Sequence, residues 1–422
     1  MMKRSALIVI LILLIFFVIS FLTNILGPLI PDIIDSFSLS IGMAGFLPFS
    51  FFVAYGVMSI PAGVLIEKYS EKPILLFSFF IAFLGALFFA LFPKFYVALI
   101  SLFSIGIGMA MLQVAINPLL RQAGGEGNFA FYSVLAQLVF GLASFLSPQL
   151  YSYLVLNVHT ENTSFIIKML NHLVPENLEW ISLYWVFTIV VLLMILIIRF
   201  VKFPKVVRLE DEKIQTGAAF KDLLRNKYVI LFFIGIFAYV GTEQGIANWT
   251  SKFLQMYHDV DPATKGADAI SYFWGLLTVG CVLGLLLLKL FDCRTILIVF
   301  TSGALISLTF ALFGPVQVAF YAFPLTGFFA SVMWSVIFSL ALNSVSHHHG
   351  TFSGILCTGI MGGALVPLII GGLGELIGLR LGMFFLYITL GYIFSIGIWA
   401  KPLINNVTIN IRIKDFFRKT KN

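Results

Sequence analysis

Long apolar runs recur along the whole chain, and they constrain its fold more than any other feature. Each run holds about twenty residues or more, enough for an α-helix to cross the roughly 30 Å hydrocarbon core of a bilayer. That core holds no water to bond exposed backbone groups, so such runs must be helices. Only 11% of the 422 residues are charged, against about 25% in soluble proteins. The sequence therefore predicts an all-α polytopic membrane protein.

Hydropathy and turn signals divide the chain into twelve spans. The apolar run that follows the first residues continues too far for a signal peptide, so we interpret it as an uncleaved first span. The predicted spans cover residues 5–34, 41–67, 72–92, 95–121, 128–156, 180–202, 228–257, 267–290, 294–314, 316–344, 350–375 and 381–404.

The basic residues predict an orientation. The net charge is +7, which in a membrane protein reflects the excess of Lys and Arg in cytoplasmic loops. With the N-terminus inside, 21 of the 26 Lys and Arg residues fall on the cytoplasmic side of the predicted spans. The other side keeps 5 of them: Lys94, Lys168, Lys252, Lys265 and Arg380. Both termini are therefore expected in the cytoplasm.

The longest polar stretch between spans predicts a division into two halves. It lies between the sixth and seventh spans and reads "KFPKVVRLEDEKIQTGAAFKDLLRNK" (Lys202–Lys227). We expect a six-helix bundle over 1–202, a cytoplasmic linker over 203–227, a second six-helix bundle over 228–404 and a basic cytoplasmic tail over 405–422. The halves echo each other weakly, because "GLASFLSP" in span five and "GGALVP" in span eleven both place Gly and Pro deep in a helix. Repeats with interrupted helices are typical of secondary transporters.

Several other function classes find no support. Cys281, Cys293 and Cys357 are interpreted as free thiols rather than a disulfide framework. The run His347–His349 is expected to form a cytoplasmic turn, because three consecutive side chains cannot face one metal ion from a helix. We find no phosphate-binding loop, nucleophile elbow or zinc-protease motif. We therefore expect no enzyme, no metal site, no organic cofactor and no nucleic-acid partner.

The motifs resemble the major facilitator superfamily, and more closely its fucose, glucose and galactose permease branch. "GVLIEKYSEK" (Gly63–Lys72) is similar to the superfamily's loop motif, except that Ser70 stands where a second Gly is usual. The branch resemblance rests on six segments in family order: "SIPAG" (Ser59–Gly63), "LQVAINP" (Leu112–Pro118), "LAQ" (Leu135–Gln137), "YVGTEQGIANW" (Tyr239–Trp249), "IFSLALN" (Ile337–Asn343) and "SGILCTGIMGGALVP" (Ser353–Pro367). The resemblance implies an alternating-access symporter for a monosaccharide or similar small sugar.

The chain also departs from this branch. The fucose–proton members carry an acid in span four where this chain has Gln113, and another in span one where alignment on Pro31–Leu39 places Gly27. In span eight, Cys281 stands where an Arg is common. Loss of both acids puts proton coupling by that route in doubt and slightly favours sodium.

Glu243 is the one acid placed clearly inside a predicted span. A carboxylate at bilayer depth is costly and is usually functional. Glu243 can carry a proton, or it can act as a hard oxygen ligand for Na⁺, helped by backbone carbonyls loosened around Gly241 and Gly245. The alternative is a glutamate that only bonds a neighbouring helix. We predict that Glu243 couples the ion, H⁺ or Na⁺, to transport.

Amide side chains form the predicted sugar site. Amides both donate and accept hydrogen bonds, which suits sugar hydroxyls in a dry cavity. The alternatives are bonding between helices and, for Asn117, bonding to backbone freed by Pro118. Trp249 and Trp334 are candidates to stack on a sugar ring, although Trp249 also suits an anchor at the membrane interface. The predicted sugar-binding residues are Asn24, Gln113, Asn117, Gln137, Gln244, Asn248, Trp249 and Trp334.

The loop motif implies a conformational latch. By resemblance, its charges favour one transport state through contacts with neighbouring helix ends, although ordinary cytoplasmic charge is the alternative. The predicted latch residues are Gly63, Glu67, Lys68, Lys72 and Arg121.

The sequence thus predicts a transporter that imports a neutral monosaccharide by cation symport. The alternatives are another cargo on the same carrier, such as an amino-sugar, a glycan fragment or another small solute, and a membrane sensor that does not transport. The expected partners are the sugar, the cation and the lipid bilayer. By resemblance, we expect a monomer in a bacterial inner membrane.

Overall fold

The computed structural model describes residues 6–124, 129–160, 164–203, 218–345 and 349–401. Within these ranges the chain is helical and contains no strand. Twelve segments of the described chain are long and apolar enough to cross a membrane, which confirms the predicted count. They cover Ala6–Phe37, Ile41–Ile66, Glu71–Leu91, Phe95–Ile116, Leu135–Asn157, Glu179–Phe200, Lys227–His258, Pro262–Leu288, Cys293–Phe313, Val316–Leu342, Thr351–Ile377 and Leu379–Trp399.

The first half of the molecule contains spans one to six. In it α5 and α4 pack on α6, and α1 packs on α7. Its helices are α1 (Ala6–Thr23), α2 (Leu26–Phe37), α3 (Ile41–Ala44), α4 (Phe46–Tyr69), α5 (Glu71–Leu91), α6 (Phe95–Gly124), α7 (Phe129–Asn157), α8 (Phe165–Leu173), the 3₁₀ turn η2 (Glu179–Ile181) and α9 (Ser182–Phe200).

The second half contains spans seven to twelve and follows the short helix α10 (Ala218–Arg225). In it α14 packs on α12 and α13, and α17 packs on α11. Its helices are α11 (Lys227–His258), the π-turn η4 (Pro262–Gly266), α12 (Ala267–Leu290), α13 (Cys293–Phe313), α14 (Val316–Ala330), α15 (Met333–Leu342), α16 (His349–Thr358), the 3₁₀ turn η5 (Gly359–Met361), α17 (Gly362–Ile377), α18 (Leu379–Gly382) and α19 (Phe385–Trp399).

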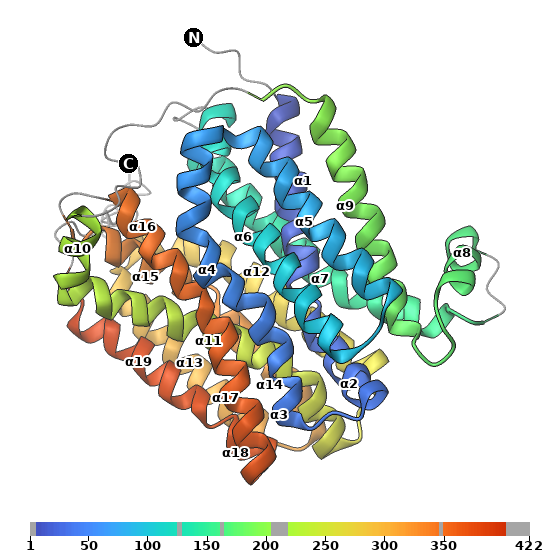
Figure 1. The fold of residues 1–422 in the computed structure, drawn as a ribbon. Helices are drawn as coiled ribbons and strands as arrows, with labels where there is room; N and C mark the ends of the chain where they lie inside the picture. The colour runs from blue at the N-terminus through green and yellow to red at the C-terminus, as the bar shows by residue number, and fades with distance from the viewer. Residues whose placement is uncertain (1–5, 125–128, 161–163, 204–217, 346–348, 402–422) are drawn as a thin grey trace, which may run out of the picture.

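The bundle has two distinct ends (Figure 1). We call the end where α1 begins, α9 ends and α10 lies the linker end. At the opposite end lie α3, α18 and the turn between α1–α2 and α4. The charge count predicts that the linker end faces the cytoplasm.

Three spans are interrupted near the middle of the bundle. Span one breaks at Asn24–Ile25, between α1 and α2, and span ten breaks at Ser331–Val332, between α14 and α15. Span eleven passes through the 3₁₀ turn η5. The break in span one has a local cause, because Pro28 has no amide hydrogen to donate to the carbonyl of Asn24, four residues earlier. Span five stays one continuous helix around Pro148.

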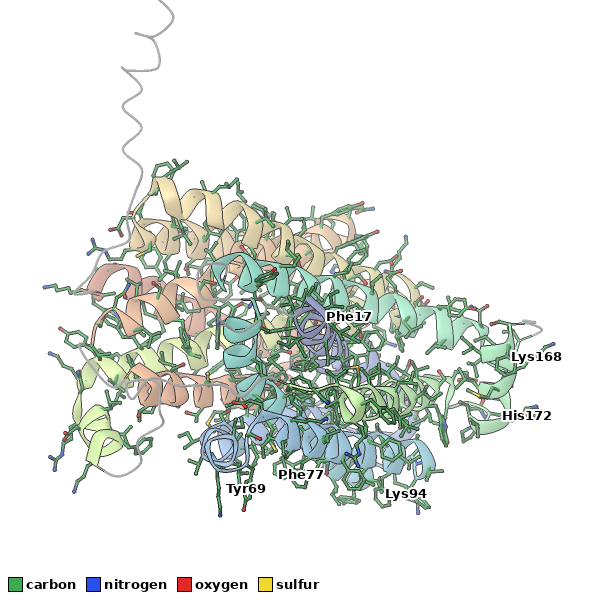
Figure 2. The ribbon with its side chains drawn as sticks, turned by 90° about the horizontal axis from the view of Figure 1, so that it is seen from above. Phe17, Tyr69, Phe77, Lys94, Lys168 and His172 are labelled. Carbon is green, nitrogen blue, oxygen red and sulfur yellow. The ribbon has the colours of Figure 1, made fainter. Side chains whose placement is uncertain are left out.

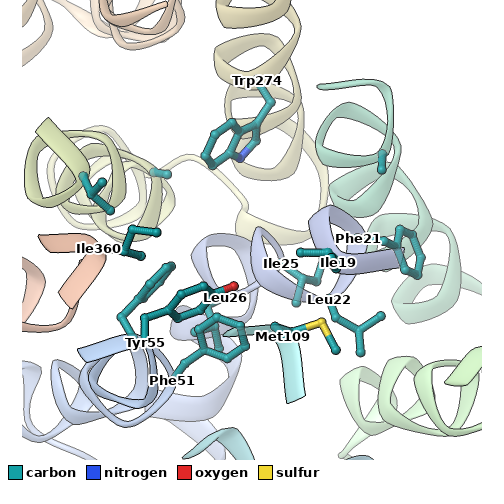
Figure 3. Packing of buried hydrophobic residues seen from close by; sticks show 14 of the residues in the cluster. Ile19, Phe21, Leu22, Ile25, Leu26, Phe51, Tyr55, Met109, Trp274 and Ile360 are labelled. Atoms are coloured by element: carbon teal, nitrogen blue, oxygen red, sulfur yellow. The ribbon is translucent and has the colours of Figure 1, made fainter. Parts of the chain in front are cut away.

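The two halves meet along several helix pairs, among them α7 with α12, α4 with α17, α2 with α11 and α3 with α17. Apolar side chains fill the space between them. Figure 3 shows Trp274 and Ile360, from the second half, across from Ile25, Leu26 and Tyr55 of the first half. All five side chains are buried.

The closest approach between α2 and α11 occurs at Gly27. A Cβ atom at this position would lie 2.2 Å from the carbonyl oxygen of Ala247, and the contact atom is backbone. By the resemblance described above, Gly27 stands where an acid is expected in the fucose–proton branch. In this packing no side chain fits there, which gives a physical reason for the departure.

Apolar side chains cover the outside of the bundle, as a lipid-facing surface requires. Phe77, Phe80 and Phe88 on α5 are each about half exposed, and Phe77 points away from the bundle in Figure 2. The segment between spans five and six contains α8, which stands at the edge of the molecule and carries Lys168 and His172 (Figure 2).

Ser70 links α4 to α5 with φ 67° and ψ 173°. Residues with a side chain rarely adopt this conformation, and holding one there costs about 1–3 kcal/mol. The usual Gly of the loop motif would remove that cost.

We expect Ser70→Gly to raise the melting temperature in detergent, because the substitution relieves about 1–3 kcal/mol of backbone strain. The control is Ser104→Gly, inside α6, which should lower the melting temperature because Gly costs about 0.5–1 kcal/mol in a helix interior. A fall in both variants would contradict the strain argument.

We expect Gly27→Ala to destabilise the protein by about 1–3 kcal/mol, the typical cost of overpacking a close contact. Gly372→Ala is the matched control, because a Cβ atom there meets nothing within 4 Å. Thermal unfolding of both variants measures the difference. Equal melting temperatures would show that α2 and α11 can separate without cost.

Candidate functional site

Glu243 lies in the middle of α11, where both carboxylate oxygens have a donor. The hydroxyl of Tyr239, one turn earlier, donates to Oε2, and Nε2 of Gln244 donates to Oε1 at 3.2 Å. The aromatic ring of Trp334 on α15 packs 6.1 Å from the ring of Tyr239, and Cys281 of α12 interacts electrostatically with the carboxylate. The acid is therefore held inside the second half, close to one of the predicted sugar-stacking residues.

The helix around Glu243 is regular, contrary to one expectation. The α-helix continues without a break from Lys227 to His258, so its carbonyls are bonded within the helix rather than loosened around Gly241 and Gly245. The two glycines serve packing instead. Cβ atoms at these positions would lie 2.3 Å from Val366 and 2.9 Å from Leu386.

A chain of hydrogen bonds leads from Glu243 into the first half. Nε2 of Gln244 also donates to Oδ1 of Asn24, at 3.4 Å. Nδ2 of Asn24 donates to the hydroxyl of Ser144 on α7, at 2.8 Å. The hydroxyls of Ser144 and Ser20 lie 2.6 Å apart, and both lie within bonding distance of the carbonyl of Phe140. Each hydroxyl has one hydrogen, so one of them donates to the other serine while the other donates to Phe140. We call Tyr239, Glu243, Gln244, Asn248, Asn24, Ser20 and Ser144 the central polar network.

Asn248 sets the orientation of the Gln244 amide. Its Nδ2 donates to the backbone carbonyl of Gln244 at 2.8 Å and to Oε1 of Gln244 at 3.4 Å. Asn24, Gln244 and Asn248 are all buried. Three of the predicted sugar-binding residues therefore lie together beside the predicted ion-coupling acid.

Trp249 lies elsewhere. Its ring is fully buried, its Nε1 donates to the carbonyl of Pro367 at 3.0 Å, and it packs against Gly371 of α17. In this conformation the indole joins α11 to α17 inside the second half and has no free face for a ligand.

The amides of spans four and five lie on the first half. Gln113 of α6 is half-buried, and Gln137 of α7 is exposed. The side chains of Asn117 and Pro118 are outside the described set, as are those of Glu67 and Arg121 in the predicted latch.

One of the predicted latch residues, Lys72, contacts a helix end of the first half. Nζ of Lys72 donates to the carbonyls of Arg199 and Val201, at 2.9 and 2.7 Å, and so caps the C-terminus of α9. Gly63 is buried in α4, and Lys68 is exposed beside Tyr69. The predicted turn at His347–His349 falls largely on residues that the structure does not describe.

A second set of polar contacts joins the halves at the opposite end, and the sequence did not predict it. Oε2 of Glu375 on α17 accepts from the hydroxyl of Ser40 at 2.8 Å and from the amide of Gly42 at 2.9 Å. Two further pairs do the same: Lys252 with Asp35, at 3.8 Å, and Gln149 with Asp268, at 2.8 Å. We call these three pairs the opposite-end seal.

The opposite-end seal shows which end of the molecule is closed in this structure. Its residues come from both halves, so the seal must open whenever the opposite end opens. Ile41 strengthens it, because its carbonyl closely approaches Gly371. The structure therefore shows the molecule closed at the opposite end.

Comparison with known proteins identifies similar chains along most of the sequence. The model of the Major Facilitator Superfamily matches residues 12–367. A glucose/galactose transporter of Brucella abortus biovar 1 (strain 9-941) is 30% identical over 396 residues, which cover 91% of this chain and 92% of the relative. The L-fucose-proton symporter of Escherichia coli (strain K12) is 25% identical over 382 residues, 86% of each chain.

The fold is shared with a solved transporter. A crystal structure of the Escherichia coli fucose:proton symporter superposes with a TM-score of 0.67 at 22% identity, covering 94% of this chain and 100% of that one. At this identity the match shows the fold alone.

We expect Glu375→Ala to favour opening at the opposite end, because it removes two hydrogen bonds between the halves. Each such bond contributes about 0.5–1.5 kcal/mol. In a background without Cys281, Cys293 and Cys357, a single cysteine at Ile41 should then react several-fold faster with a membrane-impermeant maleimide. Glu176→Ala, at an exposed residue, is the control and should leave the rate unchanged. An unchanged rate in Glu375→Ala would mean that the other contacts alone keep this end closed.

Proposed function

The chain belongs to the Major Facilitator Superfamily, and on that premise we propose that it imports a neutral monosaccharide together with a proton by alternating access. The observation that carries the proposal is the central polar network. It places a half-buried acid beside three amides, at the contact between the two halves. An acid at that position can sense both the cation and the arrangement of the halves.

The structure favours a proton over sodium as the coupling ion. A sodium site needs several converging oxygen ligands, and the regular helix around Glu243 keeps its carbonyls in backbone bonds. The partners of the carboxylate are a phenol and an amide NH₂, and both donate hydrogen. Such donors stabilise a carboxylate that gains and loses a proton. The relative from Escherichia coli is named an L-fucose-proton symporter, which agrees with this choice.

The proposed sugar site is neutral. Asn24, Gln244 and Asn248 supply amides at its centre, and Trp334, half-buried on α15, supplies a ring face. Amide and indole groups suit the hydroxyls and C–H faces of an uncharged sugar. The remaining proposed contacts come from spans four and five, at Gln113, Asn117 and Gln137. We leave Trp249 out, because its indole is committed to α17.

The proposed motion divides the chain as the polar stretch at Lys202–Lys227 predicts. Residues 1–202 and 228–404 move as two units, with 203–227 as the linker and 405–422 as a cytoplasmic tail. The opposite-end seal closes one access path, and the latch at Gly63–Lys72, with Arg121, controls the other. We place the protein in a bacterial inner membrane as a monomer with both termini in the cytoplasm.

Counterflow and gradient-driven uptake in proteoliposomes test this function. Labelled glucose, galactose and L-fucose are the probes, and pH and sodium gradients are imposed separately. We expect an inward pH gradient, and no sodium gradient, to drive accumulation of at least one probe. We expect Glu243→Gln to lose this accumulation and to keep exchange, because the amide cannot bind or release the proton. Normal pH-driven accumulation in Glu243→Gln would refute the role of Glu243, and sodium-driven uptake would reassign the ion.

If the wild-type protein exchanges none of the three sugars, the proposal that its cargo is a neutral monosaccharide is refuted. Uptake of an amino-sugar or a small glycan fragment would then identify another cargo on the same carrier. If none of these probes is transported, the alternative of a membrane sensor that does not transport is favoured.

A further inference from the structure

We propose that Gln244 is a positioning residue that couples protonation of Glu243 to the contact between the two halves. The inference rests on the proposed function and adds to it the path by which the proton acts. Gln244 is the one described residue that bonds both the Glu243 carboxylate and a side chain of the first half.

The Gln244 amide divides its two hydrogens between the halves. Nε2 lies 3.2 Å from Oε1 of Glu243, within α11, and 3.4 Å from Oδ1 of Asn24, at the break in span one. An NH₂ group has two hydrogens and no acceptor capacity. Both partners therefore depend on a single group, and a change at one of them alters the bond to the other.

The neighbours of Gln244 fix its orientation. Asn248 donates to Oε1 of Gln244, so this oxygen must face Asn248. Asn24 donates through its own Nδ2 to Ser144, so Oδ1 of Asn24 must face Gln244. Turning either amide would put two donors or two acceptors against each other and leave buried polar groups unpaired, which is unfavourable.

Protonation of Glu243 breaks this arrangement. Each carboxylate oxygen accepts one bond in this structure, so each keeps a lone pair that can take a proton. A phenol is a stronger donor than an amide, so Tyr239 keeps its bond to Oε2 and the proton enters at Oε1. The protonated oxygen is a weaker acceptor than a carboxylate oxygen, so the bond from the Gln244 NH₂ to Oε1 weakens. Because the same NH₂ also bonds Asn24, that change alters the bond to the first half.

The groups around the Glu243 carboxylate leave one path by which its protonation can affect the first half. The titratable groups that interact with Glu243 among the described residues are Tyr239 on the same helix and Cys281 on α12. On the side of the first half, the network partners Asn24, Ser20 and Ser144 are neutral. The state of Glu243 therefore reaches the first half through the orientation of one amide.

Three variants test the coupling by Gln244. Gln244→Met has similar length and no NH₂ group, Asn24→Leu removes the acceptor in the first half, and the third variant combines both. Each is compared with wild type for exchange of labelled glucose, galactose and L-fucose at equal pH, and for accumulation driven by a pH gradient.

We expect each single variant to lose about tenfold in the ratio of accumulation to exchange, in the range of typical coupling between sites. The double variant should lose no more than either single variant, because all three break the same contact. A loss of accumulation and exchange by the same factor would overturn the proposal, since it shows that Gln244 only binds sugar or supports packing. Multiplied losses in the double variant would also overturn it.

Glu243→Gln separates this inference from the function on which it rests. If Glu243→Gln keeps pH-driven accumulation, the proposed coupling at Glu243 fails. If Glu243→Gln is uncoupled and both Gln244→Met and Asn24→Leu stay coupled, the proton acts by another path and only the role of Gln244 fails. The two single variants lie on different helices, so misfolding of one leaves the other as a test.

Discussion

The interior of a membrane leaves no water to bond a polar side chain, and the organisation of this protein depends on that constraint. Each polar group at depth needs a protein partner. Glu243, Gln244, Asn248 and Asn24 meet the requirement together, in one chain of bonds that crosses from α11 to the break in span one. These bonds involve residues of both halves. The contacts that pair the polar groups therefore also join the first half to the second half.

Proline placement provides much of this geometry. Asn24 and Ser144 each stand four residues before a proline, Pro28 and Pro148. A proline cannot bond the carbonyl four residues earlier, so each site has backbone that is not fully used by its helix. In span one this produces a break, and in span five the helix continues. The network thus includes the break in span one, where the first half is locally irregular, and the continuous helix of span five beside it.

The sequence predicted the helices well and their faces in part. Length and hydropathy locate twelve spans, because crossing the bilayer needs about twenty apolar residues. The positions of Gln244 and Asn248, four residues apart, also predict a shared helix face. The same argument separates Trp249 from them, since adjacent residues on a helix face different ways, and the structure places its indole against α17.

The opposite-end seal and the serines of the network were beyond such reasoning. Glu375 and Ser40 are 335 residues apart, and their meeting depends on how two bundles tilt against each other. Hydropathy reports that a segment is buried in lipid and says nothing of that tilt. Ser20 and Ser144 resemble the many serines that bond their own helix, so their type carries no signal.

The close packing of α2 on α11 explains both the absence of an acidic side chain at Gly27 and the contact between Asn24 and Gln244. Spans one and seven run in the same direction, and Gly27 meets Ala247 one turn beyond the point where Asn24 meets Gln244. The backbone approach at Gly27 leaves no room for an acidic side chain. That same approach brings the Asn24 and Gln244 amides, one turn away, within bonding distance. Span one therefore reaches Glu243 through one side chain, Gln244, which bonds both Asn24 and the Glu243 carboxylate.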